Sequence, residues 1–255
     1  MTTEPKVNGP CWVELGARDV PRQGDFYGKV FGWDTATDPR PEAGGYTIAS
    51  LDGRRVAAVS PLYGDDQPVA WNVSFRVEDV DAALDSVRGL GGAAVLGPLD
   101  VFDDGRFAVA ADPTGAVFQL WQAKEFAGAQ LMGEPGSLCW VDLHTRDIAA
   151  ASDFYGRLFG WELGGGTGYR VLSLGATPFG GIFDQGSDEG YPKEIPPHWL
   201  PSFATADIEG TVVKAAEAGG ATVMPPMRMP GGVTAAALTD PEGAGFGLMQ
   251  TPGGE

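Results

Sequence analysis

Two pairs of ionisable residues have the types and spacing needed for an acid and a base that act on one substrate. Asp142 and His144 are separated by a single residue, so on a β-strand both side chains share a face, roughly 7 Å apart. Glu14 and Arg76 form the corresponding pair in the first half of the chain. Because positioned acids and bases accelerate proton transfer, these four are the candidate catalytic residues. For Glu14 and Arg76 we favour an internal ion pair that neutralises itself.

The remaining imidazole and thiol groups offer less chemistry. The chain has two histidines, His144 and His198. For His144 a pocket-facing role and a surface role both stay open, whereas His198 follows two prolines and is interpreted as a loop histidine. Cys11 and Cys139 are the two cysteines, too few for a thiolate metal site. We expect them to be buried structural thiols that form no disulfide.

The composition excludes several classes of partner. The 255 residues include 34 acidic and 17 basic side chains, a net charge of −17. Such a surface repels the phosphates of nucleic acid and the head groups of an anionic bilayer. No apolar run approaches the length of about 18 residues that spans a membrane, and residues 1–15 lack the pattern of a secretory signal. We expect a cytoplasmic protein without nucleic-acid or membrane partners.

These candidate residues must be positioned by a fold that repeats itself. Residues 11–19, CWVELGARD, reappear as residues 139–147, CWVDLHTRD, and residues 25–33, DFYGKVFGW, reappear as residues 153–161, DFYGRLFGW. Both pairs of segments are 128 residues apart. Internal repetition at a fixed distance indicates homologous structural units. We therefore predict two modules, residues 9–123 and 137–251, joined by a linker at residues 124–136.

A weaker repeat, offset by 60 residues, divides the first module again, and the second module divides in the same way. Each quarter opens with a short alternating strand, then an Asp, then a helical segment with apolar residues three and four apart. The four Asp residues stand where a helix N-cap belongs: Asp19, Asp79, Asp147 and Asp207. The predicted unit is β-α-β-β-β, and the aromatic residues of its helix belong to the core.

The run from strand through Asp and helix to Phe-Tyr-Gly-x-x-Phe-Gly, with Asp-Pro-x-Gly before the last strand, resembles the vicinal oxygen chelate superfamily. That superfamily includes glyoxalase I, extradiol dioxygenases and bleomycin resistance proteins, and the resemblance covers residues 9–122 and 137–250. The tandem form is similar to the two-module actinobacterial type, found in anthracycline pathways and among mycobacterial culture-filtrate antigens. The resemblance implies an α+β fold in which paired β-α-β-β-β units curve each module's sheet into a half-barrel cup.

The resemblance also implies a divalent metal inside the cup, held by His or Glu side chains of the first and last strands. Those positions carry Trp12, Asn72, Gln119, Trp140, Leu200 and Gly247. Of these residues, we expect that only Asn72 could touch a metal. A catalytic site takes about three imidazole, thiolate or carboxylate ligands. We therefore expect no metal and no other cofactor.

The resemblance implies that the ligand positions point into the cup, and strand alternation then identifies the other residues that share that face. Trp12 and Trp140 would offer large flat apolar surfaces, and a few polar groups would orient a ligand on them. Cys11 falls on the opposite face, beneath the helices. Besides the candidate catalytic residues, the expected ligand-binding residues are Trp12, Asn72, Ser74, Gln119, Trp121, Trp140, Leu200, Ser202 and Met249.

The expected function is metal-independent binding of a small hydrophobic or aromatic metabolite, for sequestration, delivery or resistance. The alternative is an enzyme that acts on a small organic substrate, either a glyoxalase-like lyase or isomerase or a dioxygenase- or hydroxylase-type protein. In a third interpretation the two tryptophans plug vestigial cups and the chain is an interaction protein. A monomer and a homodimer are both compatible with the sequence.

Overall fold

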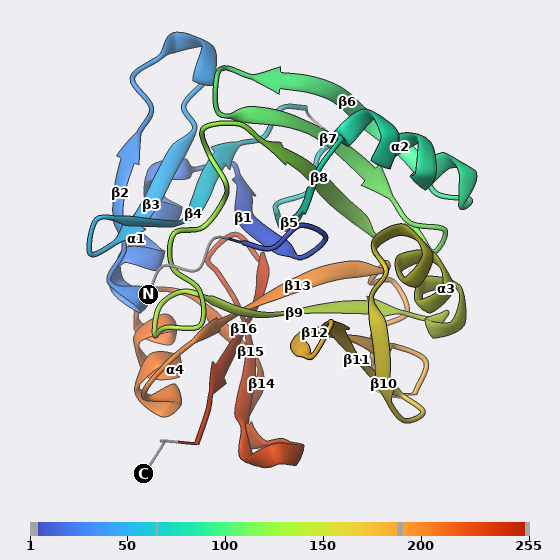
Figure 1. Ribbon diagram of the computed structural model, residues 1–255. Helices are drawn as coiled ribbons and strands as arrows, with labels where there is room; N and C mark the ends of the chain where they lie inside the picture. The colour runs from blue at the N-terminus through green and yellow to red at the C-terminus, as the bar shows by residue number, and fades with distance from the viewer. Residues whose placement is uncertain (1–4, 65, 188–190, 253–255) are drawn as a thin grey trace.

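The computed structural model describes residues 5–64, 66–187 and 191–252, and these residues form two eight-stranded sheets, one in each half of the chain (Figure 1). The first sheet has the order β2-β3-β4-β1-β5-β8-β7-β6 and the second the order β10-β11-β12-β9-β13-β16-β15-β14. With their four helices, the sheets confirm the predicted α+β fold of paired β-α-β-β-β units.

The strands of the first sheet are β1 (Pro10–Ala17), β2 (Asp34–Thr37), β3 (Thr47–Leu51), β4 (Arg54–Pro61), β5 (Ala70–Val77), β6 (Ala93–Val101), β7 (Gly105–Ala111) and β8 (Val117–Ala123). Those of the second are β9 (Leu138–Thr145), β10 (Glu162–Gly165), β11 (Tyr169–Leu174), β12 (Thr177–Asp184), β13 (His198–Ala204), β14 (Ala221–Arg228), β15 (Thr234–Thr239) and β16 (Gly245–Gln250). The helices are α1 (Val20–Phe31), α2 (Val80–Gly89), α3 (Ile148–Phe159) and α4 (Ile208–Glu217), with short 3₁₀ turns at Pro41–Ala43 and Pro230–Gly232.

Each helix begins directly after the predicted capping aspartate. The side chain of Asp19 accepts a hydrogen bond from the backbone N–H of Arg22. The other three caps accept in the same way from the N–H three residues later. A cap of this kind satisfies one of the N–H groups that have no partner within the helix. The capping aspartates therefore fix where each first strand ends and its helix starts.

The first strands of the two units lie side by side at the centre of each sheet. β1 runs antiparallel to β5, with Trp12 opposite Ser74 and Glu14 opposite Asn72. β9 and β13 pair in the same way, with Trp140 opposite Ser202. The predicted site residues thus come from central strands, whose backbones are hydrogen-bonded on both sides.

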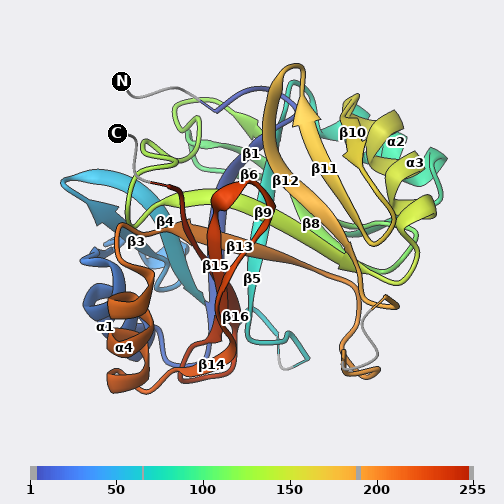
Figure 2. The same cartoon turned by 90° about the horizontal axis from the view of Figure 1, so that it is seen from below.

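The two modules share one hydrophobic core. α1 lies beside α4 and α2 beside α3, so each helix pair joins both halves (Figure 2). The hydroxyl of Tyr27, in α1, accepts from Trp71 Nε1 at 2.9 Å and donates to Asp240 of the other module at 3.1 Å. Tyr155, in α3, accepts from Trp199 Nε1 at 3.0 Å in the symmetric position. One cluster of buried apolar side chains thus includes residues of both halves. The division into residues 9–123, 124–136 and 137–251 stays a prediction.

We expect Tyr27→Phe to lower the free energy of unfolding by about 1–3 kcal/mol, because it leaves the buried Trp71 N–H and the Asp240 carboxylate without their shared partner. Chemical denaturation measures this loss. Tyr63→Phe is the control, since Tyr63 is 66% exposed. Equal stability of the two variants would contradict a role for this bridge between the modules.

None of the helices in the described residues is long and apolar enough to cross a membrane.

Candidate functional site

A tryptophan, a tyrosine and a carboxylate form a hydrogen-bonded cluster on the first sheet. Trp12 Nε1 donates to the Tyr46 hydroxyl at 2.9 Å, and that hydroxyl lies 3.1 Å from Glu14 Oε2, to which it donates. Glu14 Oε1 accepts from Gln119 Nε2 at 2.9 Å, and Gln119 Oε1 accepts from Ser74 at 2.6 Å. We call the side of the sheet that carries these five residues the first cup face.

The same cluster recurs on the second sheet. Tyr169 donates to Asp142 Oδ1 at 2.7 Å, and Trp140 Nε1 donates to both Asp142 Oδ1, at 3.1 Å, and the Tyr169 hydroxyl, at 3.0 Å. We call the side that carries these three residues and His144 the second cup face. The same Trp–Tyr–carboxylate arrangement forms with Glu14 in one module and with Asp142 in the other. The arrangement is therefore a feature of the module's fold and does not depend on which carboxylate is present.

Sequence reasoning missed the tyrosines. Tyr46 and Tyr169 correspond to each other, but they are 123 residues apart rather than 128. A tyrosine at the start of a strand is more often packed than functional. The one available signal was that both modules keep a tyrosine at this place although the loops before it differ in length.

The two carboxyl groups differ in their partners and therefore in their electrostatics. Burial raises the pKa of Glu14, and the hydrogen bonds from Gln119 and Tyr46 oppose that rise. Burial raises the pKa of Asp142 to about 6, against the bonds from Tyr169 and Trp140. Both of these bonds go to Oδ1, and no described residue donates to Asp142 Oδ2. The second cup face thus presents a carboxyl group whose pKa is raised to about 6 and whose Oδ2 can accept a further hydrogen bond.

A histidine pair borders Asp142. His144 lies opposite His198 in the β9–β13 pairing, and the rings stack with centroids 4.9 Å apart. His198 Nδ1 lies 2.9 Å from the Pro196 carbonyl, which can only accept, so Nε2 of the neutral ring is left as an acceptor. The interpretation of His198 as a loop residue is wrong, because β13 begins with it.

Burial, aided by the neighbouring His198, lowers the pKa of His144 to about 3. The ring is therefore neutral at physiological pH. Its Nδ1 lies 3.0 Å from the Tyr191 hydroxyl, which holds the ring in place. His144 is half-buried and lies two residues after Asp142 in β9, and which of its two open roles it takes stays a prediction.

The predicted Glu14–Arg76 ion pair is wrong. Glu14 is bound by an amide and a phenol, as described above, whereas Arg76 Nη1 donates to the Pro5 carbonyl at 2.8 Å. The acid–base pair of the first module is thus not assembled. The physical reason is that Gln119 reaches Glu14 from β8 and satisfies the oxygen that a guanidinium would have taken.

The prediction for the face of Cys11 also needs correction. A register shift between Pro10 and Trp12 leaves Cys11 as an extra residue in the β1–β5 pairing. Such a bulge breaks the alternation of faces, so Cys11 packs with Trp12, Ala58 and Ala129 instead of beneath the helices. The thiol is fully buried, as expected, and burial raises its pKa. Cys139, at the equivalent shift in β9, is half-buried, and both thiols are free.

The remaining predicted ligand-binding residues divide between the two faces. Asn72 and Trp121 are half-buried in the first sheet, and Leu200 and Met249 are half-buried in the second. Ser202 is buried at 5% exposure. In the register of the sheets Asn72 lies opposite Glu14, and Leu200 lies opposite Asp142.

The segment after β8 covers the first cup face. The ring of Phe126 packs edge-on against Trp12, with centroids 4.9 Å apart, and Ala129 N donates to the Cys11 carbonyl at 2.7 Å. Trp12 is consequently only 5% exposed. On the second cup face Trp140 is half-buried and Tyr169 is 36% exposed. The cluster that is sealed in the first module is thus accessible in the second.

The donor set does not fit the divalent metal that the superfamily resemblance implies. Tryptophan occupies one of the two first-strand ligand positions in each module, and Trp12 and Trp140 use their indole N–H groups as donors within the clusters. Among the described residues no three His, Cys, Asp or Glu side chains converge on one point. Neither cup face supplies the roughly three ligands of a catalytic site.

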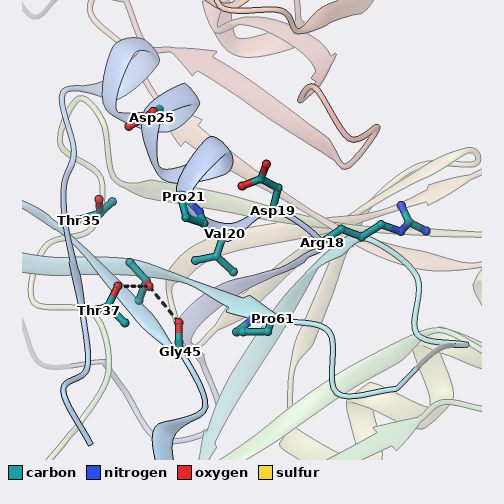
Figure 3. Close-up of a pocket in the computed structure, with 10 residues that line it drawn as sticks. Arg18, Asp19, Val20, Pro21, Asp25, Thr35, Thr37, Gly45 and Pro61 are labelled. Carbon is teal, nitrogen blue, oxygen red and sulfur yellow. Dashed lines mark hydrogen bonds between the residues drawn. The ribbon is translucent and has the colours of Figure 1, made fainter. Parts of the chain in front are cut away.

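One surface hollow is lined by none of the residues named on the two cup faces. It has a volume of about 650 Å³ and opens between the start of α1 and strands β2 and β3 (Figure 3). Its lining includes Arg18, Asp25, Thr35 and Thr37. Thr37 and Thr47 hydrogen-bond each other at 3.0 Å, so part of its polar lining is already satisfied. It contains no aromatic side chain, and we do not assign the site there.

We expect Gly181→Ala to disrupt the second cup face. A Cβ atom at Gly181 would overlap the Tyr169 hydroxyl and lie 2.7 Å from Asp142 Oδ1. One of the three groups must move, at about 1–3 kcal/mol of stability, and the Tyr169–Asp142 bond is lost. Thermal unfolding and ligand titration measure both effects. Gly164→Ala is the control, because nothing lies within 4 Å of its Cβ position. Wild-type behaviour of Gly181→Ala would contradict the geometry described for this cluster.

Comparison with known proteins matches both halves of the chain. The family model described as the Glyoxalase/Bleomycin resistance protein/Dioxygenase superfamily matches residues 11–120 and 137–248. The anthracycline biosynthesis protein DnrV of Streptomyces peucetius is 39% identical over 260 residues, which cover 94% of this chain and 92% of that protein. The putative glyoxylase CFP32 of Mycobacterium tuberculosis is 36% identical over 257 residues, 97% of each chain.

Solved structures agree on the fold. The Mn(II)-bound glyoxalase from Novosphingobium aromaticivorans superposes with a TM-score of 0.68 at 17% identity, covering 96% of this chain and 82% of that chain. The 2,3-dioxygenase LapB from Pseudomonas sp. KL28 gives a TM-score of 0.67 at 15% identity, covering 97% and 93%. At such identities the likeness concerns architecture alone.

Proposed function

We propose that this chain, which belongs to the glyoxalase/bleomycin resistance protein/dioxygenase superfamily, binds a small hydrophobic or aromatic molecule on its second cup face without a metal ion. One observation carries the proposal. The Trp140–Tyr169–Asp142 cluster is accessible, whereas its counterpart in the first module is covered by the chain. The cytoplasmic location and the monomeric or homodimeric state expected from the sequence belong to the same proposal.

The chemistry of the second cup face suits such a ligand. An indole and a phenol ring supply flat apolar area, and binding sites for small molecules combine such area with a few placed polar groups. Here the polar groups are Asp142 and the neutral His144. Two of the relatives are named for anthracycline biosynthesis, which agrees with a planar metabolite that is sequestered, delivered or neutralised by binding.

Proton-transfer catalysis is the second candidate, as in a lyase or isomerase. The observation in its favour is that burial shifts Asp142 and His144 in opposite senses, raising the pKa of the acid to about 6 and lowering that of the imidazole to about 3. Paired groups with displaced pKa values are typical of acid–base sites. A dioxygenase- or hydroxylase-type reaction has less support, because the donor set does not fit a metal.

A thermal-shift screen with planar polycyclic compounds tests the proposal, since a ligand that binds only the folded state raises the melting temperature. Metal analysis of protein purified without chelator is run in parallel. We expect stabilisation by at least one planar compound and substoichiometric metal. Stoichiometric metal would contradict metal-free binding. The absence of any shift would favour the interaction-protein interpretation, and turnover of a stabilising compound would favour the enzyme.

The pKa of Asp142 predicts a pH dependence of stability. Its folded-state pKa of about 6 exceeds the unfolded value of about 3.9. Between these values the folded state holds the extra proton, so the free energy of unfolding falls as the pH rises from about 4 to about 6 and then stays level. We expect Asp142→Asn to remove this contribution and to be about 1–2 kcal/mol more stable than the wild type at pH 8, allowing for partial solvent screening.

Urea denaturation from pH 4 to pH 8 measures the difference between Asp142→Asn and the wild type. Asp153→Asn, on the exposed side of α3, is the control for removal of one negative charge. If the difference did not change with pH, Asp142 would not be the carboxyl group that burial perturbs.

A further inference from the structure

Phe126, in the predicted linker, packs on the first cup face against Trp12, Trp121 and Arg55, a set of residues that we call the aromatic seat. Its ring meets Trp12 edge-on, with centroids 4.9 Å apart and planes at 90°, and it meets Trp121 at 6.0 Å and 70°. The guanidinium carbon of Arg55 lies 5.5 Å from the ring centroid. Trp121 Nε1 donates to the Phe126 carbonyl at 2.8 Å, so both the ring and its backbone are held. The seat therefore recognises an aromatic group through geometry as well as through apolar area.

Phe126 packs on the Trp–Tyr–carboxylate cluster of the first module, and the corresponding cluster of the second module is accessible. Trp12, Tyr46 and Glu14 form the cluster in the first module, and Trp140, Tyr169 and Asp142 form it in the second. Phe126 packs on the indole of the first cluster. No aromatic ring of the described residues packs on the indole of Trp140, which has hydrogen-bond partners but no ring partner there.

The walls of the two seats differ in size. The positions 128 residues after Gln119 and Trp121 are Gly247 and Met249, both smaller. Arg55 pairs with Ser50 in the first sheet, and Pro178 pairs with Ser173 at the same place in the second. The residues at these positions of the second cup face are thus smaller than their counterparts in the first module, and Pro178 stands where the first module has Arg55.

The carboxyl groups of Glu14 and Asp142 differ in how many of their oxygens already accept hydrogen bonds. Both Glu14 oxygens are occupied, by Gln119 and by Tyr46. Replacement of glutamine by Gly247 removes that donor in the second module, and Asp142 Oδ2 accepts from no described residue. An acceptor beside an aromatic floor suits a hydroxyl group carried by the ring.

We propose that the ring of Phe126 occupies, in the first module, the position that the ring of a bound ligand takes in the second. The second cup face then takes a fused-ring aromatic compound with a hydroxyl group, its ring edge-on to Trp140 and its hydroxyl donating to Asp142. This inference rests on the proposed function, because it names the class of molecule bound at the same site.

One arm of the test titrates wild-type protein with 1-naphthol, naphthalene and decahydronaphthalene, which match in size but differ in ring character and in the hydroxyl group. The indole N–H signal of Trp140 in an NMR spectrum, assigned with Trp140→Phe, reports binding. We expect affinity to fall in the order given, with decahydronaphthalene at least tenfold weaker than 1-naphthol, about the effect of one hydrogen bond. Equal binding of naphthalene and decahydronaphthalene would overturn the inference but leave the proposed function standing. If none of the three bound, the proposed function would fail as well.

A second arm examines the seat itself. Phe126→Ala opens a ring-sized apolar space of the kind that binds small aromatics, and Phe126→Leu, which keeps it filled, is the matched control. We expect toluene to raise the melting temperature of Phe126→Ala more than methylcyclohexane does, and neither to affect Phe126→Leu. An equal response to both probes would show that the seat does not recognise an aromatic ring, against the inference. If Phe126→Ala fails to fold, the titration of the wild type still decides.

Discussion

Trp140→Ala is expected to weaken the binding of a planar ligand such as 1-naphthol at least roughly 30-fold, while the protein stays folded. Truncation of a tryptophan at the centre of a binding site typically removes about 2 kcal/mol or more, which corresponds to that factor in Kd. Trp140 is only half-buried in the protein alone, so its removal costs the fold less than it costs the ligand. Isothermal titration calorimetry measures the affinity, and circular dichroism checks the fold.

Trp140→Phe is the matched variant for this experiment. It keeps an aromatic ring but removes the N–H that donates to Asp142 and to Tyr169. We expect an affinity between those of the wild type and Trp140→Ala. An unchanged affinity in both variants would mean that the ligand binds elsewhere, and the hollow beside α1 would be the first place to examine.

The sequence predicted the parts of the fold that depend on local, repeated chemistry. The capping aspartates, the aromatic face of α1 and α3, and the central strands of each sheet all appear where the internal repeat indicates them. These elements are recognisable because each buries one face, which imposes a period of two on a strand and about 3.6 on a helix.

The outer strands left no such signal. β2 is exposed along its whole length, and every residue of β6 is exposed or half-buried. Neither strand alternates between buried and exposed residues, so no range could be assigned to it from the pattern. Edge strands lie where the sheet contributes least to the core, and their residue types are correspondingly free.

The site was predicted in its indoles and carboxylates but not in its arrangement. Alternation places Trp12 and Glu14, or Trp140 and Asp142, on one face, and the hydrogen-bonded clusters confirm that. Tyr46 directly precedes β3 and contacts residues of β1, which are far away in the sequence. The covering of the first cup face depends on how a loop without periodicity folds back. Neither follows from local pattern, and the bulge at Cys11 reverses what the pattern implies.

The covering of the first face has a direct energetic consequence. Trp12→Ala is expected to lower the free energy of unfolding by about 3–5 kcal/mol, the usual cost of removing a buried tryptophan. Trp12 is 5% exposed, packs against Phe126 and donates to Tyr46. Removal of the indole leaves a cavity, and the ring of Phe126 loses the side chain on which it packs. Chemical denaturation, monitored by far-UV circular dichroism, measures the change.

Trp140→Ala is the internal control for Trp12→Ala, because the two residues occupy equivalent positions and differ in what covers them. If both variants lost the same stability, the linker would not seal the first cup face in solution. Trp12→Ala, at a temperature where it remains folded, should still bind 1-naphthol with nearly wild-type affinity, since the second cup face is untouched. Loss of binding in Trp12→Ala with binding retained in Trp140→Ala would move the site to the first module. The two variants therefore distinguish Trp12, which we expect to stabilise the fold, from Trp140, which we expect to bind the ligand.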